Sequence, residues 1–275
     1  MIASATASWL HDVLSPAEMI EWGWRVPFLA GGVLTLIGWF VRRSLEETPD
    51  FKSLQSAENV AEAPIMTLLR DHWRVTLALL CVIAVAHAGF YIILTYMAIY
   101  LEVERGFSAA QAGTITTIAL MAYIPLVYLF ATASDRFGRR TMLLTGSILF
   151  ILVCYPAFVV LSSGGLYSAL CIVLLLVTIY TLYESTWSTF FVESFPANIR
   201  VSGFSLPLNL GAVVFGGSAP LLAEWLIQIT GNPLMPAFIL IGVAVLSLPA
   251  LFMMRETAPY VVGSTAFNIA PPRDH

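Results

Sequence analysis

The sequence predicts an all-α fold, a polytopic membrane bundle of about seven transmembrane helices. Two observations carry this prediction. Hydrophobic residues make up 59% of the 275-residue chain and charged residues only 11%, whereas soluble domains carry about 25% charged residues. The apolar residues also gather in long runs, and a run of about 20 residues can cross a bilayer as a helix.

Seven such runs follow one another along the chain, separated by short polar turns. Residues 1–14 look like the end of a helix and are too short to span a bilayer alone, and a loop is expected at 15–25. A polar segment at 44–73 separates the first run from the rest and is predicted to be an inter-bundle linker. The predicted spans cover residues 24–41, 74–101, 109–133, 141–161, 166–194, 201–227 and 234–254.

The basic residues lie mainly on one side of this arrangement. The short turn between the third and fourth spans holds Arg136, Arg139 and Arg140, and the positive-inside rule places such a turn in the cytoplasm. Counting from there puts only Arg25 and Arg105 on the opposite side. The other basic residues share the side of the turn: Arg42, Arg43, Lys52, Arg70, Arg74, Arg200, Arg255 and Arg273. The linker and the C-terminus are therefore predicted to be cytoplasmic.

A weak internal repeat marks the ends of the first and last spans. The segment 43–49 reads RSLEETP and the segment 255–259 reads RETAP. Six spans separate the copies, and an even number gives a parallel repeat, as in transporters built from two six-helix halves. The chain is then expected to start in the middle of a longer protein. The predicted parts are the end of an N-terminal bundle, a helix stub plus one full span (1–43), a cytoplasmic linker (44–73), a six-helix bundle (74–256) and a cytoplasmic tail (257–275).

Several motifs resemble one family. The turn at 135–140 reads DRFGRR and is similar to a loop motif of the major facilitator superfamily. Other segments resemble one branch of this superfamily, the metabolite:proton symporters, which transport proline and betaine, citrate, 2-oxoglutarate or shikimate. These segments are 22–28 (WGWRVPF), 45–51 (LEETPDF), 94–97 (LTYM), 193–200 (ESFPANIR) and 255–257 (RET). The resemblance implies a C-terminal six-helix transport domain preceded by one helix. It further implies a small organic solute and protons as ligands, and a bacterial inner (plasma) membrane as location.

The charges beside the central turn have two interpretations. In the simpler one, Asp135 is the N-cap of the fourth span and the arginines only fix the topology. In the functional one, the charges form a cytoplasmic gate that pairs neighbouring helix ends in one state and separates in the other. The resemblance favours the gate and implies that it holds the outward-facing state. The expected gate residues are Asp135, Arg136, Arg139, Arg140, Glu193 and Arg200.

Glu184 is an acidic residue inside the fifth span. It lies about ten residues from the inner end, or ~15 Å at 1.5 Å per residue. A carboxyl group near the bilayer midplane is costly and usually faces a cavity, and Tyr180 and Ser188, four residues to either side, make one face of the helix polar. Glu184 therefore suits proton coupling. The alternative is a protonated glutamate that only ties helices together.

His87 is the second candidate, in the second span. Tyr91 and Thr95 continue its face at i+4 and i+8. A histidine can titrate near neutral pH, so it can relay protons or meet an anionic substrate, although a lone buried histidine is more often simply hydrogen-bonded. The resemblance implies that the second and fifth spans are the seventh and tenth helices of a full transporter and line its central cavity, which places His87 and Glu184 on facing walls.

Prolines and glycines are expected to interrupt the third span, at Pro125, and the sixth, at 207–220. Asn209, beside the second of these breaks, is a further candidate for contact with the substrate. The sequence contains no G-x-S-x-G, H-E-x-x-H or phosphate-binding glycine motif, so no enzyme is predicted. The four histidines are too scattered for a metal site and no cofactor is expected. Nucleic-acid binding is not expected either, because no basic stripe exists outside the short loops.

The predicted function is secondary transport, the proton-coupled symport of a small organic solute such as a carboxylate or a zwitterionic osmolyte, by a fragment of a full-length carrier. A midplane site at the interface between repeats needs both repeats. The alternative is therefore a non-transporting membrane remnant, or a half-carrier that needs a partner N-terminal half.

Overall fold

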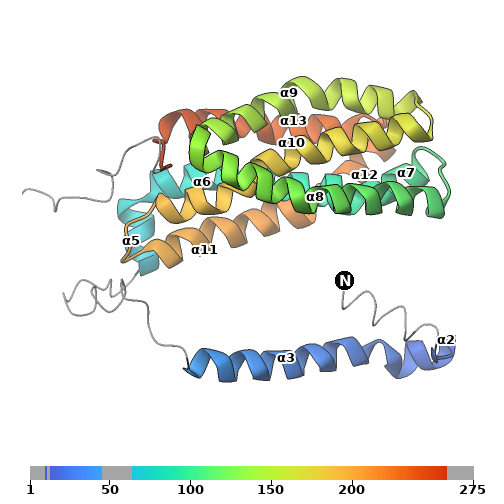
Figure 1. The fold of residues 1–275 in the computed structure, drawn as a ribbon, viewed down its shortest axis with the longest axis horizontal. Coiled ribbons are helices and arrows are strands. Elements are labelled where there is room, and N and C mark those ends of the chain that lie inside the picture. Colours follow the sequence, from blue (N-terminus) through green and yellow to red (C-terminus); the bar gives the residue numbers. More distant parts are fainter. Residues whose placement is uncertain (1–9, 11–12, 45–63, 259–275) are drawn as a thin grey trace, which may run out of the picture. The chain divides into compact units, whose positions relative to one another are not determined.

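The structure is a computed structural model that describes residues 10, 13–44 and 64–258. All elements in these ranges are helices, and seven of the described helices are long and apolar enough to cross a membrane. The predicted all-helical membrane fold is confirmed. The chain divides into two units, residues 1–57 and 58–275, whose helices are labelled in Figure 1.

The first unit contains α2 (Pro16–Glu18), the π-helical segment η1 (Met19–Gly23) and α3 (Arg25–Ser44). The loop expected at 15–25 is therefore wrong, because most of that segment is helical and leads into the first span. Ser15 opens it by donating from its N–H and its hydroxyl group to the Glu18 carboxylate, at 2.9 and 2.7 Å. These hydrogen bonds lower the pKa of Glu18.

The second unit holds the other six spans. The first of its described helices, α5, lies inside the predicted linker, whose residues 45–63 are outside the described part of the chain. The elements are α5 (Pro64–Asp71), α6 (Trp73–Gly89), η2 (Phe90–Tyr96), α7 (Met97–Val103), α8 (Ala109–Phe137), α9 (Arg139–Ser163), α10 (Leu166–Glu193), α11 (Arg200–Gly211), η3 (Ala212–Gly217), α12 (Ser218–Thr230) and α13 (Met235–Met253).

Within this unit, α10 packs against α8 and α9, while α13 packs against α6 and α9. The long helices run side by side, as Figure 1 shows. Polar groups tie them together inside the bundle. The buried Tyr183 hydroxyl donates to the Val82 carbonyl at 2.8 Å, and the Ser147 and Ser247 hydroxyls hydrogen-bond at 2.8 Å. Such neutral ties suit a bundle in lipid, where helices gain little from apolar contact alone.

Two spans change their helical period midway. The sixth span has its expected interruption in the form of the π-helical segment η3, between α11 and α12. The second span contains a π-helical segment, η2, that was not predicted. The expected interruption of the third span is wrong, because α8 continues through Pro125 as one α-helix. Neighbouring helices can satisfy the backbone groups that a proline frees.

Candidate functional site

A cavity lies between α6, η2 and α10. Its volume is about 210 Å³, and its lining residues are Ala86, His87, Phe90, Glu184 and Trp187. The structure thus brings together the two titratable residues that the sequence singled out, one from the second span and one from the fifth. The two aromatic side chains give the same space an apolar wall. A small solute with both a charged and an apolar part fits this combination.

Glu184 faces two hydrogen-bond donors of its own helix. The Tyr180 hydroxyl and the Trp187 indole N–H both lie close enough to interact with its carboxyl group. Neither donor completes a well-aligned hydrogen bond with any described residue, although both polar atoms are buried. The Tyr180 ring is held in place by stacking on Tyr123, at 6.1 Å between ring centroids. Of the two donors, Trp187 lines the cavity and Tyr180 does not. Because buried donors normally find partners, a water molecule or a solute in the cavity can complete the hydrogen bonding of Trp187.

His87 is oriented by contacts on three sides. Its Nδ1 lies 3.3 Å from the carbonyl oxygen of Ile83. A carbonyl oxygen can only accept, so this bond requires the proton on Nδ1 and leaves Nε2 free to bind a proton or a ligand. The Trp187 ring lies beside the imidazole, at 6.4 Å between centroids. On another side, a Cβ atom at Gly211 or Gly216 would come within 3.5 Å of the imidazole.

Two residues expected to share the face of His87 do not line the cavity. Tyr91 packs on η3, where a Cβ atom at Gly216 would approach its ring to 2.8 Å. Thr95 is exposed. Both residues lie in η2, whose wider π-helical turn replaces the α-helical period on which the spacing from His87 to Thr95 was based.

Asn209 is also outside the cavity lining. It is exposed, and its side-chain N–H donates to the Ser205 carbonyl at 2.7 Å. Conversely, sequence reasoning missed Phe90 and Trp187, which do line the cavity. Trp187 follows Glu184 by three residues, so helical spacing was the available signal. Among the described residues, no group of three or more acidic, histidine or cysteine side chains forms a metal cluster.

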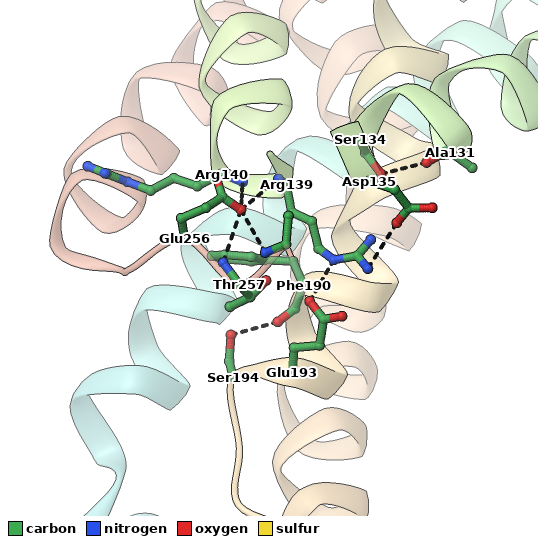
Figure 2. A network of polar contacts seen from close by, with 11 residues as sticks. Ala131, Ser134, Asp135, Arg139, Arg140, Phe190, Glu193, Ser194, Glu256 and Thr257 are labelled. Carbon is green, nitrogen blue, oxygen red and sulfur yellow. Dashed lines mark hydrogen bonds and ion pairs between the residues drawn. The ribbon is translucent and has the colours of Figure 1, made fainter. Parts of the chain in front are cut away.

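Arg139 is the centre of a second polar site, at one end of the bundle. Its guanidinium pairs with Asp135, at 3.1 Å from Nη2 to Oδ1, and with Glu193, at 2.6 Å from Nε to Oε2 (Figure 2). The arginine side chain is only 8% exposed. The partner side chains are partly exposed, Asp135 to 45% and Glu193 to 26%, and the two ion pairs join the ends of α8, α9 and α10.

The remaining expected gate residues make other contacts. Arg136 is exposed, and Arg200 donates from Nε to a backbone carbonyl in the loop before α11; neither forms an ion pair within the described ranges. Arg140 reaches α13 instead. Its Nε donates to the Leu251 carbonyl at 2.7 Å and its Nη2 to the Phe252 carbonyl at 3.2 Å, so it caps carbonyl groups at the end of α13.

Asp135 is not the N-cap of the fourth span. It lies in the last turn of α8, which continues to Phe137. A single residue, Gly138, separates α8 from α9, and its φ of 100° is readily adopted only by glycine. The prediction failed because both helices continue beyond their apolar runs, so the turn is much shorter than the polar segment.

Glu256 takes the place of the missing N-cap. Its Oε1 accepts hydrogen bonds from the backbone N–H groups of Arg139 (2.7 Å) and Arg140 (3.3 Å), and from those of Thr257 and Ala258 (Figure 2). A carboxylate satisfies the free N–H groups of a helix start and interacts favourably with the helix dipole. Arg140 and Glu256 therefore cap each other's helices. The sequence analysis had marked the segment 255–259 (RETAP) that contains Glu256 as one copy of the internal repeat, but not as a cap for α9.

Seven long apolar helices among the described residues, with a cavity that holds two ionisable side chains, define a multi-pass helical membrane protein. The chain belongs to the Major Facilitator Superfamily, because the model of that family matches residues 1–206 and, in a second match, residues 79–268. The resemblance drawn from the sequence motifs is confirmed.

The relatives of known function are transporters. The chain is 30% identical over 260 residues to the citrate-proton symporter of Klebsiella pneumoniae, covering 94% of this chain and 58% of the relative. It is 31% identical over 262 residues to the proline/betaine transporter of Escherichia coli (strain K12), covering 90% and 51%. It is 30% identical over 273 residues to the ectoine/proline transporter of Corynebacterium glutamicum, covering 94% and 54%. The chain thus spans about half the length of these relatives, and no solved structure gives a significant match.

Proposed function

We propose that this chain acts in a proton-coupled secondary transporter for a small organic solute, such as a carboxylate or a zwitterionic osmolyte. The observation that carries the proposal is the shared cavity of Glu184 and His87 inside a bundle of this superfamily. Ionisable groups inside a membrane bundle mark substrate or proton pathways. The names of the relatives, for citrate with protons and for proline, betaine and ectoine, support the solute class.

In the proposed mechanism, Glu184 is the proton carrier. A protonated carboxyl group is neutral and can donate one hydrogen bond to the solute, whereas the carboxylate accepts from Tyr180 and Trp187. Loss of the proton therefore exchanges the partners of Glu184 and weakens its hold on the solute. The free Nε2 of His87 gives the solute a second polar contact, and Phe90 and Trp187 exclude water from its apolar part.

We further propose that an N-terminal bundle completes the site. The relatives are about twice as long as the part matched here, and sites of such carriers lie between two repeats. In this arrangement residues 1–43 belong to the first bundle, 44–73 form the cytoplasmic linker, 74–256 form the second bundle and 257–275 form a tail. The bundles rock about the bound solute and expose it to each side in turn.

The ion pairs of Arg139 with Asp135 and Glu193 are proposed to close the cytoplasmic side. They tie three helix ends together, and their separation would let these ends move apart. Exposed Arg136 and loop-bound Arg200 are proposed to contact the other bundle. The proposed location is the plasma membrane of a bacterium with a cytoplasmic C-terminus, which the distribution of basic residues and the bacterial origin of the relatives support.

Uptake into proteoliposomes tests this function. The protein, purified from its native membranes through a C-terminal tag, is assayed with labelled zwitterions, dicarboxylates and tricarboxylates under an imposed pH gradient. At least one solute class is expected to accumulate, and a protonophore should abolish the accumulation. Accumulation that survives collapse of the pH gradient would contradict proton coupling.

A half-carrier or a non-transporting remnant is the second candidate, and the observation that favours it is the coverage of only about half of each relative. An immunoblot of the chromosomally tagged protein separates the candidates. A band near 30.1 kDa with no larger product supports a half-carrier or a remnant. A product of nearly twice that mass supports a complete carrier.

A further inference from the structure

A second carboxyl group lies inside the bundle, away from the cavity. Glu224 is a half-buried residue of α12, within the sixth candidate span. Six residues separate it from the end of α12 at Thr230, or ~9 Å along the helix. Because α11 starts at Arg200, just after the Arg139 site, Glu224 lies toward the opposite end of the bundle.

Uncharged side chains donate hydrogen bonds to the Glu224 carboxyl group. Its Oε2 accepts a hydrogen bond from the buried Tyr96 hydroxyl at 2.7 Å, and its Oε1 accepts from the Gln228 side-chain N–H at 3.1 Å. The helical elements that pack against α12 most closely are η2, η3 and α13. Their only titratable side chains are Tyr91 and Tyr96, and none of these segments contains a lysine, arginine or histidine. Glu104, after α7, is the other charged group that acts on Tyr96.

The described segments that pack most closely against α12 therefore offer a charged Glu224 carboxylate no cationic side chain; Arg105, after α7, acts on Tyr100. Structural ties in this bundle do not need a charge, as the Ser147–Ser247 hydrogen bond between α9 and α13 shows. An ionisable group in a membrane span without a cationic partner is costly while charged and becomes neutral by taking up a proton. Glu224 is thus held by two neutral donors, without a cationic side chain in the described segments that pack most closely against α12.

Tyr96, which donates to Glu224, lies close along the chain to residues that line the cavity. The segment η2 begins at Phe90, which lines the cavity, and ends at Tyr96, which holds Glu224. The two π-helical segments also touch, because a Cβ atom at Gly216 of η3 would approach Tyr91 of η2 to 2.8 Å. The hydrogen bond between Tyr96 and Glu224 thus joins the outer parts of two spans just beyond their π-helical turns.

We propose that Glu224 is a second proton-binding group of the transport cycle, held by Tyr96 and placed on the outer side of the Glu184 cavity. This inference rests on the proposed proton-coupled transport. While ionised, Glu224 accepts the charge-assisted hydrogen bond from Tyr96 and fixes α12 to η2. On taking a proton from the outer side it keeps only a weaker neutral hydrogen bond, which loosens this end of the bundle beside the cavity.

Infrared titration of the whole chain in lipid nanodiscs tests the proton site without any transport. Wild type is expected to show a protonated-carboxyl band from Glu224 that changes in intensity with pH, and Glu224→Gln should remove this band. Tyr96→Phe removes the hydroxyl that donates to the Glu224 carboxylate, so the carboxyl band that Glu224→Gln removes should also be altered in this variant. Tyr100→Phe is the matched control, since Tyr100 donates to the Pro233 carbonyl and not to Glu224.

Two results would overturn the proposal. One is a set of titrating bands that is identical in wild type and Glu224→Gln. The other, in the transport-competent protein, is a pH profile of uptake that Glu224→Gln leaves unchanged; the expected result is a flattened profile with solute exchange preserved. Glutamine still accepts from Tyr96, so the variant should fold, and solute exchange checks that it does. If wild type itself does not transport, the proposed function fails while the infrared result still decides whether Glu224 binds a proton.

Discussion

Replacement of Glu256 by alanine should destabilise the bundle measurably, because this one side chain caps α9. Loss of a capping side chain costs about 1 kcal/mol, within a range of about 0.5–2. Loss of a negative charge at a helix start costs about 0.3–1 kcal/mol more. Since Oε1 accepts from the N–H groups of both Arg139 and Arg140, both contributions apply. The free energy of unfolding should fall by about 1–3 kcal/mol.

The assay is reversible unfolding of the purified protein by dodecyl sulfate in mixed micelles, followed by tryptophan fluorescence. Glu256→Gln is the matched control, because the amide oxygen still accepts but carries no charge, so only about 0.3–1 kcal/mol should be lost. Arg140→Gln should destabilise as well, because it uncaps the end of α13. The reasoning is refuted if Glu256→Ala unfolds like wild type, or if the alanine and glutamine variants lose the same stability.

Two further predictions concern the gate and the π-helical contact. Glu193→Gln leaves the nearly buried Arg139 with Asp135 as its remaining acidic partner. Labelling of a cysteine introduced at Ala86, which lines the cavity, should therefore become faster from the cytoplasmic side than without Glu193→Gln, and an unchanged rate would exclude the gate. Gly216→Ala places a Cβ atom 2.8 Å from the Tyr91 ring, and since overpacking costs about 1–3 kcal/mol, its thermal midpoint should drop. Gly217→Ala, where the nearest heavy atom is 4.0 Å away, should melt like wild type, and equal midpoints would argue against the tight contact.

The spans could be predicted closely because the bilayer itself sets their length. The predicted fifth span, 166–194, differs from α10 (Leu166–Glu193) by one residue. The third and fourth spans were predicted too short, since their helices continue past the apolar run to Phe137 and start again at Arg139. The hydropathy of the sequence indicates which residues lie in the lipid, not where a helix ends. A helix can continue beyond the lipid into water when its end is capped.

The site residues could be predicted only where helical spacing and charge were enough to single them out. Both Glu184 and His87 stand out as ionisable groups in apolar runs. The contact between Arg139 and Glu256 joins residues 117 positions apart, and no local pattern indicates it. The π-helical turn of η2 moves Thr95 away from the cavity, and the spacing from His87 to Thr95 was based on an unbroken α-helix.

Proton movement driven by the solute tests the central claim most directly. Proteoliposomes with an internal pH dye contain either the tagged protein from native membranes or its Glu184→Gln variant, and a solute found by the uptake assay is added outside. The account predicts acidification inside the wild-type vesicles. The Glu184→Gln vesicles should exchange labelled solute without any change in internal pH. Acidification by Glu184→Gln at the wild-type rate would contradict the assignment of Glu184 as the proton carrier.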